Sequence, residues 1–274
     1  MRTLERCLVI AHRGFRGIAP ENTLLAAREA RAAGAGMWEL DVAASSDGEL
    51  VVMHDDSLAR TTDAAARFPG REPWTVYDFS LAELRSLDAG SWYGQADPFG
   101  QARSGRVGAS AIASFEGLRI PTLAEALDLT RALGFSVNVE IKDATGRACD
   151  GWIVERAVDA IRERGMAGAT LVSSFNHDYL RRAKAAEPGL AVGALVDEAP
   201  PDTAGALRDL GAYSLNPGLE LLSRAAVEEA RAAGFEVFVW TVNEKDDMRR
   251  VIEWGASGIF TDFPDRLVEV LAEG

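Results

Sequence analysis

The chain has 274 residues, of which 47% are hydrophobic and 26% are charged, and its formal net charge at pH 7 is −13. This is the composition of a globular protein, and so negative a chain repels both nucleic acids and anionic membrane surfaces. It contains no apolar run of the roughly 18 residues that a membrane span requires. Its first apolar stretch is too short for a signal peptide. We therefore expect a cytoplasmic protein with no stable membrane association, and reduced thiols at Cys7 and Cys149.

Short apolar runs alternate with amphipathic helical patterns along most of the chain. The predicted strands are residues 8–12, 37–42, 50–55, 136–142, 170–175, 191–196, 212–216, 236–242 and 258–262. Helices are predicted between most of them, for example over 152–165, where apolar residues recur on one face. Such sustained alternation is typical of a parallel sheet, and eight strand–helix units close into a TIM-type (β/α)8 barrel.

Two segments depart from this alternation. Only twelve residues separate Asp41 from His54, too few for a crossover helix, so we predict a turn and an antiparallel strand within 42–54. Residues 56–120 are rich in Gly, Ser, Ala and Arg, and the second half is predicted to be loop. We interpret 56–120 as a small insertion over the barrel mouth, within a single domain that spans 1–274.

Charged and polar residues cluster where the predicted strands end. They are His12, Arg13, Glu39, Asp41, His54, Asp55, Glu140, Lys142 and Trp240. The carboxyl ends of parallel barrel strands share one face, where active sites form, so we expect these side chains to converge.

The carboxylates in this set predict a metal site. Glu39 and Asp41 alternate along one strand and therefore point to the same side, as Glu140 and Lys142 do on another. Buried carboxylates need neutralisation, and one hard divalent cation, Mg²⁺ or Ca²⁺, prefers such oxygen ligands. The alternative is a set of ion pairs with Arg13 and Lys142. We favour the metal because inward-facing acids outnumber the nearby bases and two histidines remain unexplained.

The histidines and the cations indicate phosphate chemistry. His12 and His54 could each serve as acid or base near neutral pH, although a histidine at a strand end is often structural. Arg13 and Lys142 beside a metal form a clamp for a phosphate group. Trp240 offers an apolar wall for the substrate's organic part, or core packing. His177 is interpreted as a surface residue at a helix start rather than as part of the mouth.

The sequence Pro20-Glu21-Asn22-Thr23 is interpreted as a helix start, with Asn22 or Thr23 as the cap. This reading requires no catalytic role, so Glu21 is not placed in the predicted site.

Taken together, the ordered motifs resemble the glycerophosphodiester phosphodiesterase family. They are AHRG and PENT (11–23), ELDV (39–42), VVMHDDSLARTT (51–62), LDAGSWYG (87–94), IPTLAEAL (120–127), VNVEIK (137–142), SSFN (173–176), VWTVN (239–243) and GIFTDFPD (258–265). The stretch 95–114 is longer than usual for the family, which leaves the shape of the lid, and with it the alcohol accepted, open.

The resemblance implies a TIM-type barrel that hydrolyses glycerophosphodiesters to glycerol 3-phosphate and an alcohol. It implies metal ligands at Glu39, Asp41 and Glu140, phosphate contacts at Arg13 and Lys142, and an acid–base pair at His12 and His54. The nucleophile is either water or the substrate's own glycerol hydroxyl. Alternative functions are a lysophospholipase D or phosphoinositide phospholipase activity at the same site, and a barrel that binds phosphorylated ligands without turnover.

Overall fold

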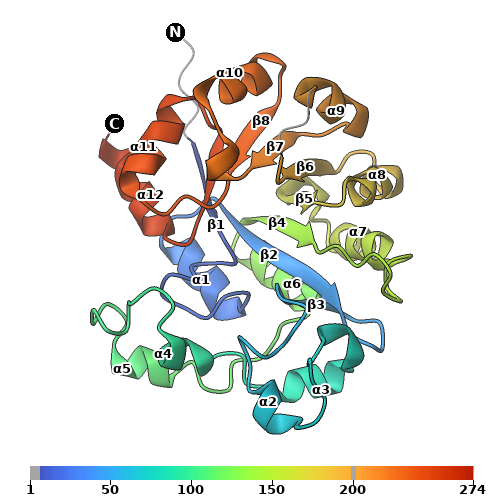
Figure 1. Cartoon of the computed structure of the whole chain (residues 1–274), viewed down its shortest axis with the longest axis vertical. Coiled ribbons are helices and arrows are strands. Elements are labelled where there is room, and N and C mark those ends of the chain that lie inside the picture. The colour runs from blue at the N-terminus through green and yellow to red at the C-terminus, as the bar shows by residue number, and fades with distance from the viewer. Residues whose placement is uncertain (1–6, 199–201, 274) are drawn as a thin grey trace.

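The computed structural model of the protein describes residues 7–198 and 202–273. Its strands are β1 (Leu8–Ala11), β2 (Met37–Ala44), β3 (Leu50–Val52), β4 (Ser136–Ile141), β5 (Thr170–Ser174), β6 (Ala191–Val196), β7 (Ser214–Pro217), β8 (Glu236–Val239) and β9 (Gly258–Thr261). Within this part of the chain, β1, β2 and β4 to β9 pair in parallel, and β1 pairs with both β2 and β9, so the sheet closes (Figure 1). The predicted (β/α)8 barrel is confirmed.

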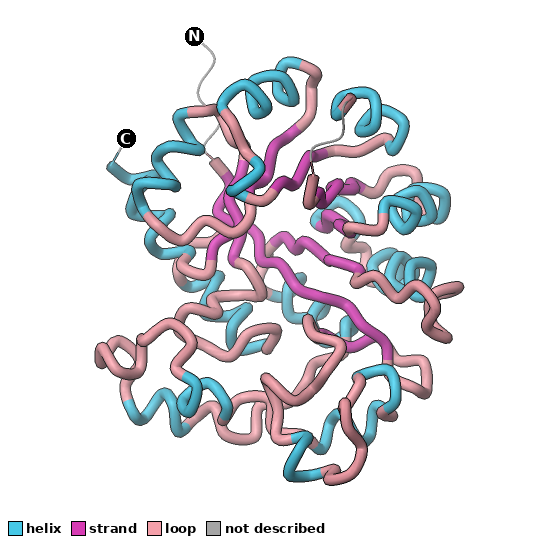
Figure 2. The backbone as a smooth tube through the Cα atoms, viewed as in Figure 1, coloured by secondary structure: helices cyan, strands magenta, loops and turns pink. Residues whose placement is uncertain are grey.

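Helices form the outer layer around the strands (Figure 2). They are α1 (Leu24–Ala32), α6 (Leu123–Ala132), α7 (Ile153–Glu163), α8 (His177–Ala186), α9 (Thr203–Leu210), α10 (Arg224–Ala232), α11 (Lys245–Glu253) and α12 (Pro264–Glu273). On α7 the predicted apolar face is buried, including Val154, Val158 and Ile161. Short 3-10 helices lie at Val76–Asp78, Ala167–Ala169 and Leu219–Leu221.

The ninth predicted strand lies outside the parallel barrel. β3 pairs antiparallel with β2, with Val42 opposite Val52 and Ala44 opposite Leu50. The turn between these strands is too short for a crossover, as the sequence predicted. The antiparallel return extends the sheet beyond β2 and directs the chain into the insertion.

The insertion contains α2 (Ala64–Arg67), α3 (Leu81–Ser86), α4 (Trp92–Ala96) and α5 (Ala109–Ala113). The stretch 95–114 is therefore partly helical. Apolar residues of the insertion, including Leu58, Phe79 and Leu84, are buried in one cluster with Ala43 of β2 and Val51 of β3. The insertion also contacts the loop after β1, because the Tyr93 hydroxyl donates to the Gly17 carbonyl oxygen at 2.6 Å. These contacts attach the insertion to a loop that carries predicted site residues.

The barrel interior changes from apolar to polar toward the carboxyl ends of the strands. Ile10, Leu171, Phe238 and Phe260 form a buried cluster contributed by four strands. Since side chains alternate along a strand, the residue two positions later faces the same way. For those four residues the later positions are His12, Ser173, Trp240 and Asp262. Ser173 lies on β5, and the other three come directly after their strands, where Trp240 still packs against the apolar cluster.

Candidate active site

Three carboxylates from two neighbouring strands lie close together. Glu39 and Asp41 lie on β2, Glu140 lies on β4, and the Cα atoms of Asp41 and Glu140 are register partners. One carboxylate oxygen from each of the three lies within 4.8 Å of the others. The structure therefore brings together the set that the sequence predicted to hold a cation.

The chemistry of this set fits a hard divalent cation. Glu39 Oε1 and Asp41 Oδ1 are buried and receive no hydrogen bond from the described residues. Burial, followed by the charges of Asp41 and Glu140, raises the pKa of Glu39 well above its usual range. Burial and Asp41 also raise the pKa of Glu140. Carboxylate oxygens that lie close together and lack hydrogen-bond donors are suitable ligands for Mg²⁺ or Ca²⁺.

Two cations flank the carboxylates, so the ion pairs weighed as an alternative to metal are also present. Lys142 Nζ lies 2.8 Å from Glu140 Oε1 and 3.6 Å from Asp41 Oδ1. Arg13 Nε lies 3.4 Å from Asp41 Oδ2. Burial acts to raise the pKa of Asp41, but Arg13, together with His54 and Lys142, outweighs it and lowers that pKa. The surroundings of Asp41 therefore favour its ionised form.

Each of the two predicted acid–base histidines has a carboxylate on the same ring nitrogen. His12 Nδ1 lies 2.8 Å from Asp262 Oδ1, and His54 Nδ1 lies 2.6 Å from Asp55 Oδ1. An ionised carboxylate only accepts, so Nδ1 carries the hydrogen and Nε2 is left for proton transfer. Burial and Arg13 lower the pKa of His12, although the bond to Asp262 opposes them. A neutral His12 can act as a base near neutral pH.

The turn after β1 places a backbone donor in the site. Arg13 has φ of 54° and Gly14 has φ of 79°, both in the left-handed region. A Cβ at Gly14 would lie 2.6 Å from Ala26 on α1, so this close approach requires glycine. In this turn the Arg13 backbone N–H donates to Glu39 Oε2 at 2.7 Å.

The PENT segment does more than start a helix. Thr23 is the N-cap of α1 and accepts from the Ala26 N–H, as predicted for one of two candidates. Asn22 instead adopts φ of 58°, and its Nδ2 donates to Asp41 Oδ2 at 2.8 Å. Glu21, which the sequence analysis left out, is buried and bonds Arg13 and Arg60. The sequence did carry a signal for this: the segment offers two candidate N-cap residues, Asn22 and Thr23, and a helix needs only one. The rest of the segment was therefore free for another role.

Trp240, which was predicted to line the site, and His177, which was not, lie near the ends of other strands. The Trp240 indole N–H donates to the Asn216 carbonyl oxygen at 2.9 Å, and its ring meets that of Phe175 edge-on at 5.6 Å. Phe175 is 39% exposed. An aromatic wall at the rim is therefore available to a substrate. His177 begins α8 and its Nε2 lies 2.9 Å from the Leu195 carbonyl oxygen, a partner that fixes the ring structurally.

The fold and these groups define a (β/α)8 barrel with a cluster of three carboxylates, a flanking arginine and lysine, and two carboxylate-paired histidines. The sequence profile of the Glycerophosphoryl diester phosphodiesterase family matches residues 12–266. The chain therefore belongs to the glycerophosphoryl diester phosphodiesterase family, as its motifs indicated.

Named relatives cover nearly the whole chain. A glycerophosphodiester phosphodiesterase of Caldanaerobacter subterraneus subsp. tengcongensis is 36% identical over 269 residues, 98% of this chain and 99% of the relative. One from Bacillus subtilis (strain 168) is 31% identical over 95% of this chain and 85% of the relative. The structure of an Oleispira antarctica phosphodiesterase in complex with the product sn-glycerol-3-phosphate is similar, with a TM-score of 0.83 and 31% identity, covering 97% of each chain. Among the described residues, no helix combines the length and apolarity needed to cross a membrane.

Proposed function

We propose that this protein hydrolyses glycerophosphodiesters to sn-glycerol 3-phosphate and an alcohol, using one bound divalent cation, Mg²⁺ or Ca²⁺. The observation that carries the proposal is the juxtaposition of the carboxylates of Glu39, Asp41 and Glu140 with Lys142, Arg13 and two carboxylate-paired histidines. The family membership and the product complex of the similar Oleispira antarctica enzyme support it.

The proposed roles follow from charge and position. Glu39, Asp41 and Glu140 would hold the cation, which when bound stabilises negative charge on the phosphoryl oxygens. Arg13 and Lys142 would hold the remaining phosphate oxygens and offset the charge that develops as the reaction proceeds. The rim around Trp240 and Phe175 would contact the alcohol portion of the substrate.

The proposed reaction needs one proton acceptor and one proton donor. One histidine Nε2 accepts the proton of the attacking hydroxyl as its oxygen bonds to phosphorus, and the other donates a proton to the leaving alkoxide as that P–O bond breaks. If water attacks, the products form in one step. If the substrate's glycerol hydroxyl attacks, a cyclic phosphate forms, and water then opens it with the proton transfers reversed. Both routes consume one water molecule.

The test is release of choline and glycerol 3-phosphate from glycerophosphocholine. Chelator-treated protein is assayed alone, with Mg²⁺ and with Ca²⁺, as wild type, His12→Ala, Glu39→Ala and the matched control His177→Ala. We expect cation-restored turnover in wild type and His177→Ala, and its loss by at least about 100-fold in the other two. Turnover that survives the chelator and both substitutions would contradict the proposal. Turnover of lysophosphatidylcholine but of no glycerophosphodiester would move the substrate to lipids.

A further inference from the structure

The carboxylate partners of the two histidines are themselves held by arginines. Arg60 bonds Asp55 through Nε at 2.5 Å and Nη2 at 3.0 Å, and Asp55 bonds His54. Arg16 Nη1 lies 3.6 Å from Asp262 Oδ1, the atom that bonds His12. The two arms are therefore built alike, each running from histidine to aspartate to arginine.

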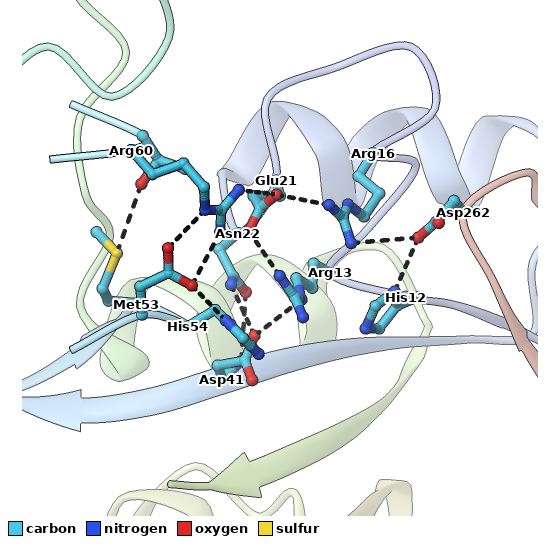
Figure 3. Close-up of polar contacts among 12 residues, drawn as sticks. His12, Arg13, Arg16, Glu21, Asn22, Asp41, Met53, His54, Arg60 and Asp262 are labelled. Carbon is cyan, nitrogen blue, oxygen red and sulfur yellow. Dashed lines mark hydrogen bonds and ion pairs between the residues drawn. The ribbon is translucent and has the colours of Figure 1, made fainter. Parts of the chain in front are cut away.

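Both arms end on one buried carboxylate. Arg60 donates from Nη1 and Nη2 to the two oxygens of Glu21, at 3.0 and 2.7 Å. Arg16 Nη2 lies 3.0 Å from Glu21 Oε2, and Arg13 Nη1 donates to Oε1 at 2.8 Å. Figure 3 shows Glu21 between the arginines, with His54 at one end of the contacts and His12 at the other. We call this set the Glu21 network: Glu21, its three arginines, Asp55, Asp262 and the two histidines.

Opposite charges hold the Glu21 network together. Its three guanidinium groups face the carboxylates of Glu21, Asp55 and Asp262, and Arg13 also lies 3.4 Å from Asp41. The network also joins segments far apart in the chain, because Glu21 follows β1, Arg60 belongs to the insertion and Asp262 follows β9. Removing the Glu21 charge would take away the carboxylate that joins Arg16 and Arg60 and release both arms at once, since removing one partner of a buried ion pair is strongly destabilising.

We propose that Glu21 is a positioning residue that orients both acid–base histidines, through Arg16 and Asp262 for His12 and through Arg60 and Asp55 for His54. The inference rests on the proposed function for its catalytic consequence. Arg60 holds Asp55 through two nitrogens, and such a bidentate guanidinium–carboxylate pair has a defined geometry. Arg16 reaches Asp262 through one contact of 3.6 Å, so it acts on Asp262 through its charge. Each aspartate in turn fixes the ring orientation and the Nδ1–H tautomer of its histidine.

The three histidines of the chain permit a direct test. Long-range ¹H–¹⁵N spectra of histidine-labelled protein distinguish protonated from unprotonated ring nitrogens. His177 donates from Nε2 to a carbonyl oxygen and so holds the opposite tautomer to that expected of His12 and His54. We expect Glu21→Gln to abolish the single Nδ1–H tautomer of both His12 and His54. Arg16→Gln should affect only His12, Arg60→Gln only His54, and none of the three should affect His177.

Turnover of glycerophosphocholine is measured on the same variants. We expect kcat to fall about 10- to 100-fold in each, the range that a misplacement of roughly 1 Å produces. The matched control is Glu155→Gln, which breaks another bidentate pair, with Arg182, on the outer side of the barrel. It should lower thermal stability and leave kcat unchanged.

The outcomes separate the two proposals. If Glu21→Gln fails to fold, Arg60→Gln decides, because the Arg60 side chain is 42% exposed and tolerates replacement better. Unchanged kcat and unchanged histidine tautomers in the folded variants overturn the positioning role. If the wild type turns over no glycerophosphodiester, the proposed function fails. The histidine tautomers then still test the Glu21 network. They support it only if Arg16→Gln changes the tautomer of His12 alone, Arg60→Gln that of His54 alone, and Glu21→Gln those of both.

Discussion

His12 Nδ1 lies 2.8 Å from Asp262 Oδ1, although the two residues are 250 positions apart in the chain. The contact exists because β1 and β9 are neighbours where the barrel closes, with Ala11 opposite Thr261. Asp262 is held from its other side by Asn243, whose Nδ2 donates to Oδ2 at 2.8 Å. Closure of the barrel therefore completes the environment of a proposed acid–base group.

Replacing Asp262 by Asn is expected to lower kcat by roughly 10²–10⁴-fold, the size of a positioned acid–base contribution. An amide can present its N–H to Nδ1, which selects the wrong tautomer and leaves Nε2 protonated. Steady-state assays with glycerophosphocholine measure the effect. Asp265→Asn, three residues further on and paired with Arg106, serves as the control and should keep its activity. Equal losses in both variants would refute this role of Asp262.

Addition of Mg²⁺ or Ca²⁺ to the chelator-treated protein is expected to raise its thermal midpoint. At a cation concentration of 100 times Kd the gain is about 2.7 kcal/mol. Glu39→Gln should remove that response. It should also stabilise the cation-free protein by about 1 kcal/mol, or roughly 2–4 °C, because glutamine cannot ionise at a position where burial, Asp41 and Glu140 oppose ionisation of Glu39. A cation-free variant less stable than wild type would show that repulsion does not dominate at Glu39. Differential scanning calorimetry provides both readouts.

Asn22→Ala is expected to destabilise the fold by about 2–4 kcal/mol. It removes the hydrogen bonds between Asn22 and the buried, charged Asp41. It also places alanine at φ of 58°, a left-handed conformation that asparagine tolerates better because its polar side chain can form local hydrogen bonds. Asn22→Gly also removes the bonds but tolerates this φ, so it should be about 1 kcal/mol less harmful. Urea unfolding measures the difference.

Two cap variants provide the scale for Asn22. Thr23→Ala and Ser223→Ala each remove the N-cap side chain of a helix, α1 and α10 respectively, and should cost about 1 kcal/mol. If Asn22→Ala cost no more than these, its bonds to Asp41 would contribute nothing beyond an ordinary cap.

Glu21 is expected to make stability depend on pH in the acid range. Burial acts to raise its pKa, but the bond from Arg60 and the charges of Arg16, Arg13 and Arg60 outweigh it and lower the pKa far below the ordinary 4.5. A carboxylate with a depressed folded pKa contributes its full stability above the unfolded pKa and loses it as pH falls toward the folded pKa. Between pH 5.5 and 3.5 the loss from this group is about 1 kcal/mol.

Comparison with Glu21→Gln isolates this contribution. The difference in unfolding free energy between wild type and variant should narrow as pH falls from 5.5 to 3.5, since all other carboxylates are common to both. Urea unfolding at several pH values measures it. A difference that stays constant over this range would mean that the Glu21 pKa is not depressed.

The barrel and the acidic cluster follow from local patterns. Alternation along each strand placed Glu39 and Asp41 on one face, and a turn too short for a crossover predicted that β3 returns antiparallel. The carboxyl ends of the strands of a parallel barrel share one face. The fold class alone was therefore enough to predict that Glu140 and Lys142 lie near Glu39 and Asp41. These features depend on periodicity, which a sequence displays directly.

The Glu21 network could not be read in the same way. Which carboxylate reaches which arginine depends on how the loop after β1, the insertion and the segment after β9 meet. Asn22 was predicted as a possible cap, yet its left-handed φ turns its side chain to Asp41 and leaves the cap to Thr23. The sequence by itself determined the barrel and the candidate chemical groups, because both follow from the periodicity of strands and helices, which residues close together in the chain set. Only the tertiary structure decided their partners, because contacts between loops depend on barrel closure and side-chain geometry.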